Sequence, residues 1–188
     1  MNHHLVRWIR LLNYSFLTIS GSLRAGSVNG EVLKALWELS GDNTEITQYD
    51  ALATLPHFNP DHEASPPASV LEWRAQLQNA QAVIICSPEY AHGVPGVLKN
   101  ALDWVVGSGE FMHKPVMLIN ASANSQFAVP QLNETLTVMM ANVQTITLSL
   151  VGKKRDELSM RLDDTVSAEL RGVLEAMTKA VDAAQANQ

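Results

Sequence analysis

The stretch best suited to chemistry is a run of small and hydroxyl residues, GSLRAGSVN, at positions 21–29. It follows an apolar, β-branched segment at residues 14–19 that is typical of a buried strand. From Glu31 onward the apolar residues have the spacing of a helix with one buried face. A loop between a strand and a helix directs backbone N–H groups and the positive end of the helix toward an anion. We therefore interpret residues 20–29 as a phosphate-binding loop, with an ordinary polar turn as the alternative.

Two other phosphate-binding motifs can be tested against the same loop. The glycines have the spacing of an NTPase P-loop, but Ser27-Val28 stands where a lysine and a following Ser or Thr are required. The three-glycine fingerprint of dinucleotide-binding folds is absent as well. The loop still offers Arg24 and several hydroxyl groups, which suit a single terminal phosphate. We expect Asn29 to be the N-cap of the following helix. The hydroxyl groups belong to Ser20, Ser22 and Ser27.

A second distinctive loop, SPEYAHGVP at residues 87–95, follows the continuous apolar run AVIIC. Such a run is typical of a central parallel strand that is buried on both faces, and its Cys86 is most simply a small core residue. Prolines stiffen both ends of the loop, Gly93 permits close backbone approach, and Tyr90 supplies a flat face with a polar tip. This combination suits a planar heterocycle, whereas the alternative is a structural loop with Tyr90 partly buried.

The elements that must position these loops alternate as strand and helix five times along the chain. This order predicts an α/β domain with a parallel sheet, right-handed crossovers and helices on both faces. The expected strands are residues 14–19, 44–49, 82–86, 116–120 and 143–151, and the expected helices start at 31, 70, 95, 130 and 163. Ligands bind at the carboxyl ends of the strands in such sheets, so we expect the loops at 20–29, 87–95 and 121–128 to form the site.

Composition narrows the possible partners. At 188 residues, the chain has the size of one domain, and its net charge of −6 argues against a nucleic-acid partner. No segment approaches the length of a membrane span, so we expect no membrane partner, and we expect a cytoplasmic location. We treat residues 1–13 as an N-terminal extension and residues 14–188 as one domain. His57 and His62 lie in a long loop at 51–68, and we interpret them as solvated surface residues rather than metal ligands.

The motifs GSLRAGSVN and SPEYAHGVPGVLKNALDW together resemble the NADPH-dependent FMN reductase family over about residues 14–180. The resemblance implies a flavodoxin-like, doubly wound five-stranded sheet of order 2-1-3-4-5, with FMN bound and a homodimer or homotetramer. It implies transfer of two electrons from NADPH or NADH through FMN to a small acceptor such as a quinone, azo compound, flavin or chromate. Because the flavin carries the chemistry, no catalytic residue is assigned.

A flavodoxin-type electron carrier, or a flavin-binding regulatory module without its own NAD(P)H turnover, remains the alternative function. Flavodoxins typically have a Thr-rich phosphate loop, whereas this chain has Arg24 there, which favours the reductase.

The resemblance also assigns the cofactor-binding residues. In the first loop, Ser22, Arg24, Ser27 and Asn29 are expected to hold the phosphate, and Ser20 and Leu23 are expected to be cofactor-binding residues as well. Those of the second loop are Pro88, Glu89, Tyr90, Ala91, His92 and Gly93, which line the isoalloxazine partly through backbone atoms. Ser122 is expected to reach the flavin from the third loop.

The sequence departs from the family pattern in two places. Ala91 stands where the family commonly has asparagine, and the third loop, at residues 121–128, lacks the glycines that lie against the flavin in many members. Four residues of the LKNALDW segment match the family, and we expect them to be structural or interfacial, with an exposed Trp104 at a subunit contact. These residues are Lys99, Asn100, Asp103 and Trp104.

Overall fold

The computed structural model describes residues 14–122, 125–150 and 164–186. Its strands are β1 (Tyr14–Ser20), β2 (Thr44–Tyr49), β3 (Ala82–Cys86), β4 (Pro115–Asn120) and β5 (Asn142–Thr147). Its α-helices are α1 (Val28–Leu39), α2 (Ala68–Asn79), α3 (Gly96–Asp103), α4 (Ala128–Val138) and α6 (Asp164–Ala186). Two short 3₁₀ helices, η1 (Leu52–Thr54) and η2 (Pro60–His62), follow β2. No helix in the described part of the chain is long and apolar enough to cross a membrane.

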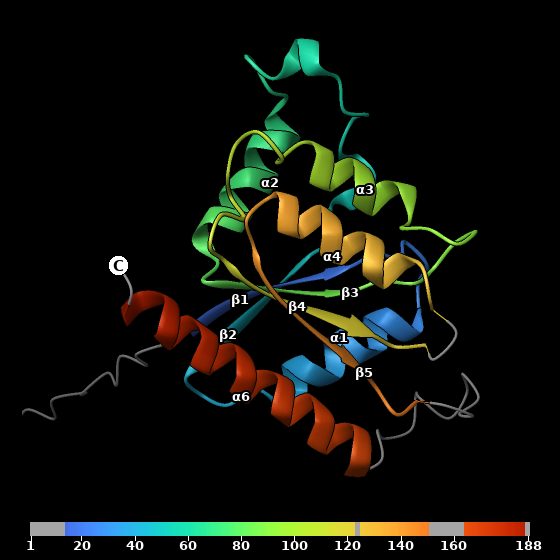
Figure 1. Ribbon diagram of the computed structural model, residues 1–188, viewed down its shortest axis with the longest axis vertical. Coiled ribbons are helices and arrows are strands. Elements are labelled where there is room, and N and C mark those ends of the chain that lie inside the picture. The colour runs from blue at the N-terminus through green and yellow to red at the C-terminus, as the bar shows by residue number, and fades with distance from the viewer. Residues whose placement is uncertain (1–13, 123–124, 151–163, 187–188) are drawn as a thin grey trace, which may run out of the picture.

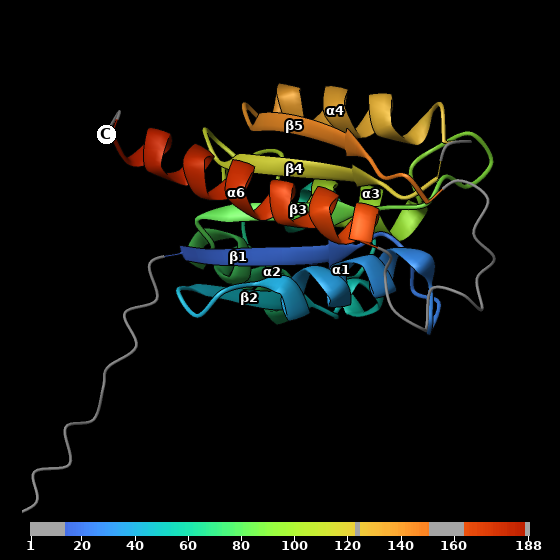
Figure 2. The ribbon, with the colours of Figure 1, turned by 90° about the horizontal axis from the view of Figure 1, so that it is seen from below.

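The strands form one parallel sheet in the order β2-β1-β3-β4-β5, which confirms the predicted α/β class and strand order. The chain runs outward from β1 to β2 and then returns to the other side of β1 to form β3. The strand order therefore reverses between β1 and β3, and ligands of doubly wound sheets bind at the carboxyl ends of the strands beside such a point. The arrows of β1, β3 and β4 all end at the same side of the molecule (Figure 2).

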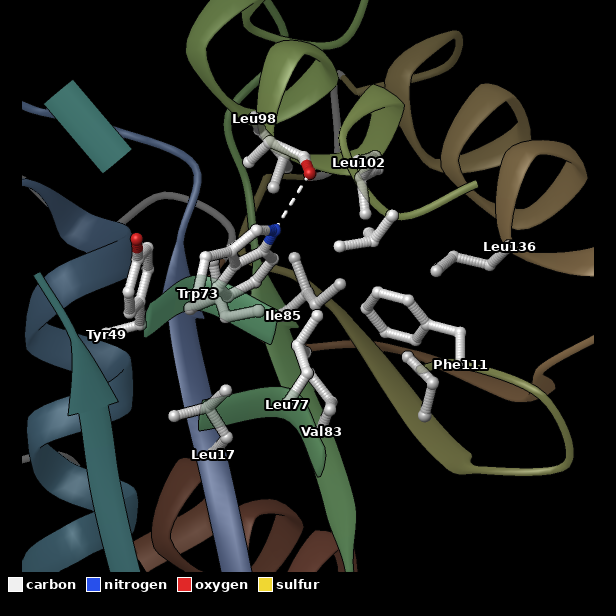
Figure 3. Packing of buried hydrophobic residues seen from close by; sticks show 14 of the residues in the cluster. Leu17, Tyr49, Trp73, Leu77, Val83, Ile85, Leu98, Leu102, Phe111 and Leu136 are labelled. Atoms are coloured by element: carbon white, nitrogen blue, oxygen red, sulfur yellow. Dashed lines mark hydrogen bonds between the residues drawn. The ribbon is translucent and has the colours of Figure 1, made fainter. Parts of the chain in front are cut away.

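Helices α2, α3 and α4 cover one face of the sheet, and α1 and α6 cover the other (Figure 1). Alternate residues of each inner strand enter the two cores, so Leu17 packs beneath α2 while Phe16 packs beneath α1. On the α2 face, the fully buried Trp73 donates a hydrogen bond from Nε1 to the carbonyl of Ala101, 2.9 Å away (Figure 3). This bond satisfies the polar atom of a large core residue and joins α2 to α3.

Several element boundaries differ from the expectations. Helix α1 begins at Val28 because the Ser27 hydroxyl accepts a hydrogen bond from Gly30 N at 3.0 Å, so the prediction of Asn29 as N-cap is wrong. The last strand ends at Thr147, short of the predicted 151. Residues 1–13, the expected N-terminal extension, lie outside the described residues, as do residues 151–163.

The expectation of an exposed Trp104 is wrong as well. Its side chain is buried, and its Nε1 donates to the carbonyl of Pro56 at 2.8 Å. Asn100 binds the same loop, since its Nδ2 donates to Pro56 O at 3.0 Å and its Oδ1 accepts from Phe58 N at 2.8 Å. These two residues are structural, because they hold the proline-rich segment between β2 and α2 against α3.

Candidate functional site

The loops that follow β1 and β3 are packed directly against each other. Gly21 N donates to the carbonyl of Cys86 at 2.9 Å, which continues the strand pairing beyond the end of β1. A Cβ atom at Gly21 would lie 2.2 Å from Ser87 Oγ and 2.8 Å from Ser87 Cβ. Position 21 therefore requires glycine so that the two loops can meet at this distance.

The first loop winds around the N-terminus of α1. The Ser20 hydroxyl accepts a hydrogen bond from Ser22 N, and the Ser22 hydroxyl accepts one from Arg24 N, both at 3.3 Å. Arg24 is exposed and forms no ion pair with any residue that the structure describes. An exposed guanidinium beside serine hydroxyls and the first-turn N–H groups of a helix is an arrangement that binds a phosphate.

Asn29 is directed into the core. It is 7% exposed, and its Oδ1 accepts a hydrogen bond from the Cys86 thiol at 3.2 Å. Burial raises the pKa of Cys86, which keeps the thiol protonated as a donor. The expectation that Cys86 is a core residue is confirmed, and its contact with Asn29 joins the first turn of α1 to the end of β3.

A cavity of about 410 Å³ opens beside the first loop. One wall consists of residues of that loop, including Arg24 and Ser27, and the other consists of residues that end or follow β2. The second wall was not anticipated from the sequence, because nothing in an exposed edge strand indicates which loop it will face. Its residues are Gln48, Tyr49, Asp50, Leu52 and Ala53.

The second loop forms a tight hairpin. Tyr90 and Gly93 exchange two backbone hydrogen bonds, of 3.1 and 3.0 Å, and the two residues between them have positive φ angles of 49° for Ala91 and 59° for His92. Positive φ at both central residues is the pattern of a type I′ turn, which non-glycine residues adopt at a cost in energy. Tyr90 is 54% exposed, so the alternative of a partly buried tyrosine is wrong, and its Oη lies 3.3 Å from Ser22 Oγ.

Glu89 joins the second loop to the third. Its Oε2 accepts hydrogen bonds from Phe127 N at 2.6 Å, Ala128 N at 2.9 Å and Ser125 Oγ at 3.2 Å. The two backbone N–H donors, Ala128 first, hold the pKa of this carboxyl below its usual range. Glu89 thus caps the N-terminus of α4 with its side chain, which leaves its backbone atoms for any ligand in the second loop.

Two further contacts hold these loops together. Gln131 Nε2 donates to the carbonyl of His92 at 3.2 Å, and Gln131 Oε1 accepts from Val94 N at 3.3 Å. The rings of His92 and Phe127 are stacked, with centroids 4.4 Å apart and an interplanar angle of 23°. Neither Gln131 nor Phe127 was predicted as a site residue, because a residue beside the start of an amphipathic helix carries no signal of its partner in another loop.

The structure therefore brings the predicted residues of the first and second loops to one edge of the sheet. Ser122 is the second residue of the third loop, and its backbone N donates to Asn120 Oδ1 at 3.1 Å. Leu23 is exposed in the first loop. Residues 123–124 of the third loop lie outside the described residues. Among the residues that are described, no group of three or more His, Cys, Asp or Glu side chains is placed to hold a metal ion.

A doubly wound parallel sheet with a candidate anion-binding loop and a stiff, aromatic-bearing loop at the strand-order reversal is typical of the flavodoxin-like, flavin-nucleotide-binding class of protein. A sequence profile described as NADPH-dependent FMN reductase matches residues 14–154, and the chain belongs to that family. It is thus an NAD(P)H-dependent oxidoreductase with FMN as cofactor, as predicted.

Known proteins agree with this assignment. The chain is 33% identical over 136 residues to a quinone reductase of Escherichia coli, covering 67% of this chain and 72% of the relative. It is 31% identical over 170 residues to an NAD(P)H-dependent FMN reductase of Pseudomonas aeruginosa, covering 86% and 91%. Among solved structures, FerB, a flavoenzyme NAD(P)H:(acceptor) oxidoreductase from Paracoccus denitrificans, superposes with a TM-score of 0.72 at 27% identity, covering 90% of this chain and 97% of FerB.

Proposed function

We propose that this protein carries two electrons from NAD(P)H to a small acceptor of the quinone class. FMN supplies the redox chemistry when it is bound, by accepting a hydride from the nicotinamide and passing two electrons on. The observation that carries the proposal is the packing of the first loop against the second, with Gly21 N bound to Cys86 O at 2.9 Å. The names of the E. coli and P. aeruginosa relatives support the choice of reaction and of acceptor.

The first loop would hold the phosphate of FMN. The Arg24 guanidinium supplies the positive charge, and the serine hydroxyls supply short-range hydrogen bonds. Leu23 and Asn29 would contribute backbone N–H groups, since the Asn29 side-chain oxygen is already bound to the Cys86 thiol. The serines concerned are Ser20, Ser22 and Ser27.

The second loop would orient the isoalloxazine. Its backbone is stiffened by the Tyr90–Gly93 hairpin, so its amide groups are fixed before the ring arrives. Pro88, Glu89, Ala91 and Gly93 would present backbone atoms to the ring edge, and Tyr90 and His92 would add their side chains. Ser122 would approach from the third loop. N–H groups near the pyrimidine end of the ring would stabilise the negative charge that develops on reduction.

The test is the visible spectrum of protein incubated with FMN and desalted, recorded under argon before and after addition of NADPH. We expect a retained yellow colour that NADPH bleaches and a quinone restores. Retained colour that NADPH cannot bleach would contradict the reductase function and favour a carrier or regulatory module. Absence of retained flavin would contradict the binding site.

A pair of variants localises the phosphate site. Arg24→Ala removes the proposed phosphate ligand and is expected to weaken FMN binding about 10- to 100-fold, as for a hydrogen bond to a charged group. Arg171→Ala is the matched control, because Arg171 is an exposed arginine on α6 beside the residues that precede β2, at the opposite edge of the sheet. Equal FMN affinity in Arg24→Ala and wild type would contradict the assignment.

We further propose that residues 14–188 act as one domain in a cytoplasmic homodimer or homotetramer. The resemblance to the family supports the oligomer, and the single buried cysteine is compatible with a reducing compartment. Light scattering coupled to size-exclusion chromatography measures the oligomeric state directly, and a monomeric mass would contradict this proposal.

A further inference from the structure

We propose that the stacked rings of His92 and Phe127 form the surface on which the electron acceptor binds, and that this surface selects planar aromatic acceptors. The inference rests on the proposed function and adds the acceptor subsite to it. It begins with exposure, since Phe127 is 44% exposed and His92 is exposed as well. Two stacked rings that leave aromatic surface open to solvent offer a third planar ring a place to stack.

The rings of His92 and Phe127 lie close to the place proposed for the flavin ring, where an electron acceptor has to bind. His92 belongs to the loop after β3, which is proposed to line the isoalloxazine, and Phe127 belongs to the loop after β4. These strands are neighbours in the sheet, so both rings lie at its carboxyl edge. An acceptor that rests on them is beside the flavin ring rather than beside the phosphate loop.

The chain holds the two rings in place through their backbones. The His92 carbonyl is bound by Gln131, and its φ of 59° is maintained by the hairpin that Tyr90 and Gly93 close. The Phe127 backbone N–H is bound by the Glu89 carboxylate. A backbone held in a costly conformation by several surrounding contacts is a recurrent feature of functional sites.

Because these contacts are made to backbone atoms, a mutation can remove either ring and leave the contacts in place. Glu89 binds the backbone of Phe127, so Phe127→Ala removes the ring and leaves the cap of α4 in place. His92→Asn removes the other ring and places a residue that accepts positive φ more readily than most. Phe127→Leu keeps an apolar side chain at the position but removes the aromatic face.

The experiment measures KM and kcat for a planar quinone, menadione, and for ferricyanide, with NADPH as donor and the FMN content of each variant determined. Ferricyanide is an octahedral complex without a planar face, so it gains nothing from stacking. We expect Phe127→Ala and His92→Asn to raise KM for menadione about five- to tenfold, with Phe127→Leu close to Phe127→Ala. The KM for ferricyanide and the FMN content should stay at the wild-type values in Phe127→Ala and Phe127→Leu. Because the His92 side chain is also proposed to line the isoalloxazine, His92→Asn is compared as the ratio of its two KM values, measured on FMN-loaded protein. Val138→Ala, at the other end of α4 and 67% exposed, is the control for loss of exposed apolar surface.

Each contrary result has a distinct meaning. Unchanged KM for menadione in Phe127→Ala and His92→Asn, or an equal rise for both acceptors, would overturn the acceptor subsite while the proposed function stands. Wild-type protein that retains FMN but reduces neither acceptor with NADPH would overturn the proposed function, and the subsite with it.

Discussion

The hydroxyl of Tyr90 lies 3.3 Å from the hydroxyl of Ser22, so the loop after β3 reaches over to the loop after β1. Ser22 belongs to the proposed phosphate-binding loop, and the Tyr90 hydroxyl therefore lies at the proposed phosphate end of the site. The remainder of the second loop, from Ala91 onward, extends toward α4, where Gln131 binds the His92 carbonyl. Tyr90 therefore lies between the part of the site that is proposed to bind the phosphate and the part that is proposed to orient the ring.

This relationship predicts selective recognition of FMN over riboflavin. Tyr90→Phe keeps the ring face and removes only the hydroxyl, so we expect FMN affinity to fall about 10-fold, as for a lost hydrogen bond to a charged group. Riboflavin, which lacks the phosphate, should bind the variant and the wild type equally. Fluorescence titration with each flavin measures both constants, and an equal loss for the two ligands would place the hydroxyl at the ring instead.

The close packing at Gly21 predicts that this position does not tolerate a side chain. Because a Cβ atom would lie 2.2 Å from Ser87 Oγ, we expect Gly21→Ala to lower the free energy of unfolding by about 1–3 kcal/mol, as for an overpacked core. The double variant with Ser87→Gly removes the Oγ and Cβ atoms that the new methyl group meets, and it should recover part of the loss. Urea denaturation checks both values, and full stability in Gly21→Ala alone would contradict the observed contact.

The positive φ angle of Ala91 predicts that asparagine at this position stabilises the folded protein. Asparagine adopts positive φ at lower cost than alanine, so Ala91→Asn should raise the free energy of unfolding by up to about 1 kcal/mol. Ala91→Val should lower it, since a β-branched residue fits this conformation poorly. Ala53→Asn is the control at an exposed alanine of η1, where no such gain is expected. A gain at position 53 equal to that at 91 would show that the turn is not its source.

The cap formed by Glu89 predicts a pH dependence of stability. Its pKa is lower in the folded protein than in the unfolded chain, so the carboxylate stabilises the fold above the ordinary pKa of glutamate, about 4.3. That contribution is lost as the pH falls through the lowered folded-state pKa. Glu89→Gln should therefore lose less stability than wild type between about pH 6 and about pH 3. Urea denaturation at the two pH values measures the difference, and equal losses in both proteins would contradict the role of the carboxylate.

Much of the fold could be predicted because it is encoded locally. The apolar run of β3 and the alternation of β2 correspond to strands with the predicted bounds, residues 82–86 and 44–49. Strands that alternate with helices predict a parallel sheet. Its strand order was predicted from the family resemblance of the two loop motifs. Errors arose where two local signals were equally good, as with Ser27 and Asn29, since both residue types are favoured at an N-cap.

The sequence by itself determined the class of fold, the loops of the candidate site and the family to which the chain belongs, because these depend on short-range patterns and on long motifs. Only the tertiary structure decided where individual side chains point. Glu89 finds its partners 38 and 39 residues further along, Asn29 meets Cys86 at a separation of 57, and Trp104 is buried by the segment around Pro56. Contacts across such separations form only when the strands are side by side, so no local pattern could indicate that Glu89 binds a helix terminus while Asn29 faces the core.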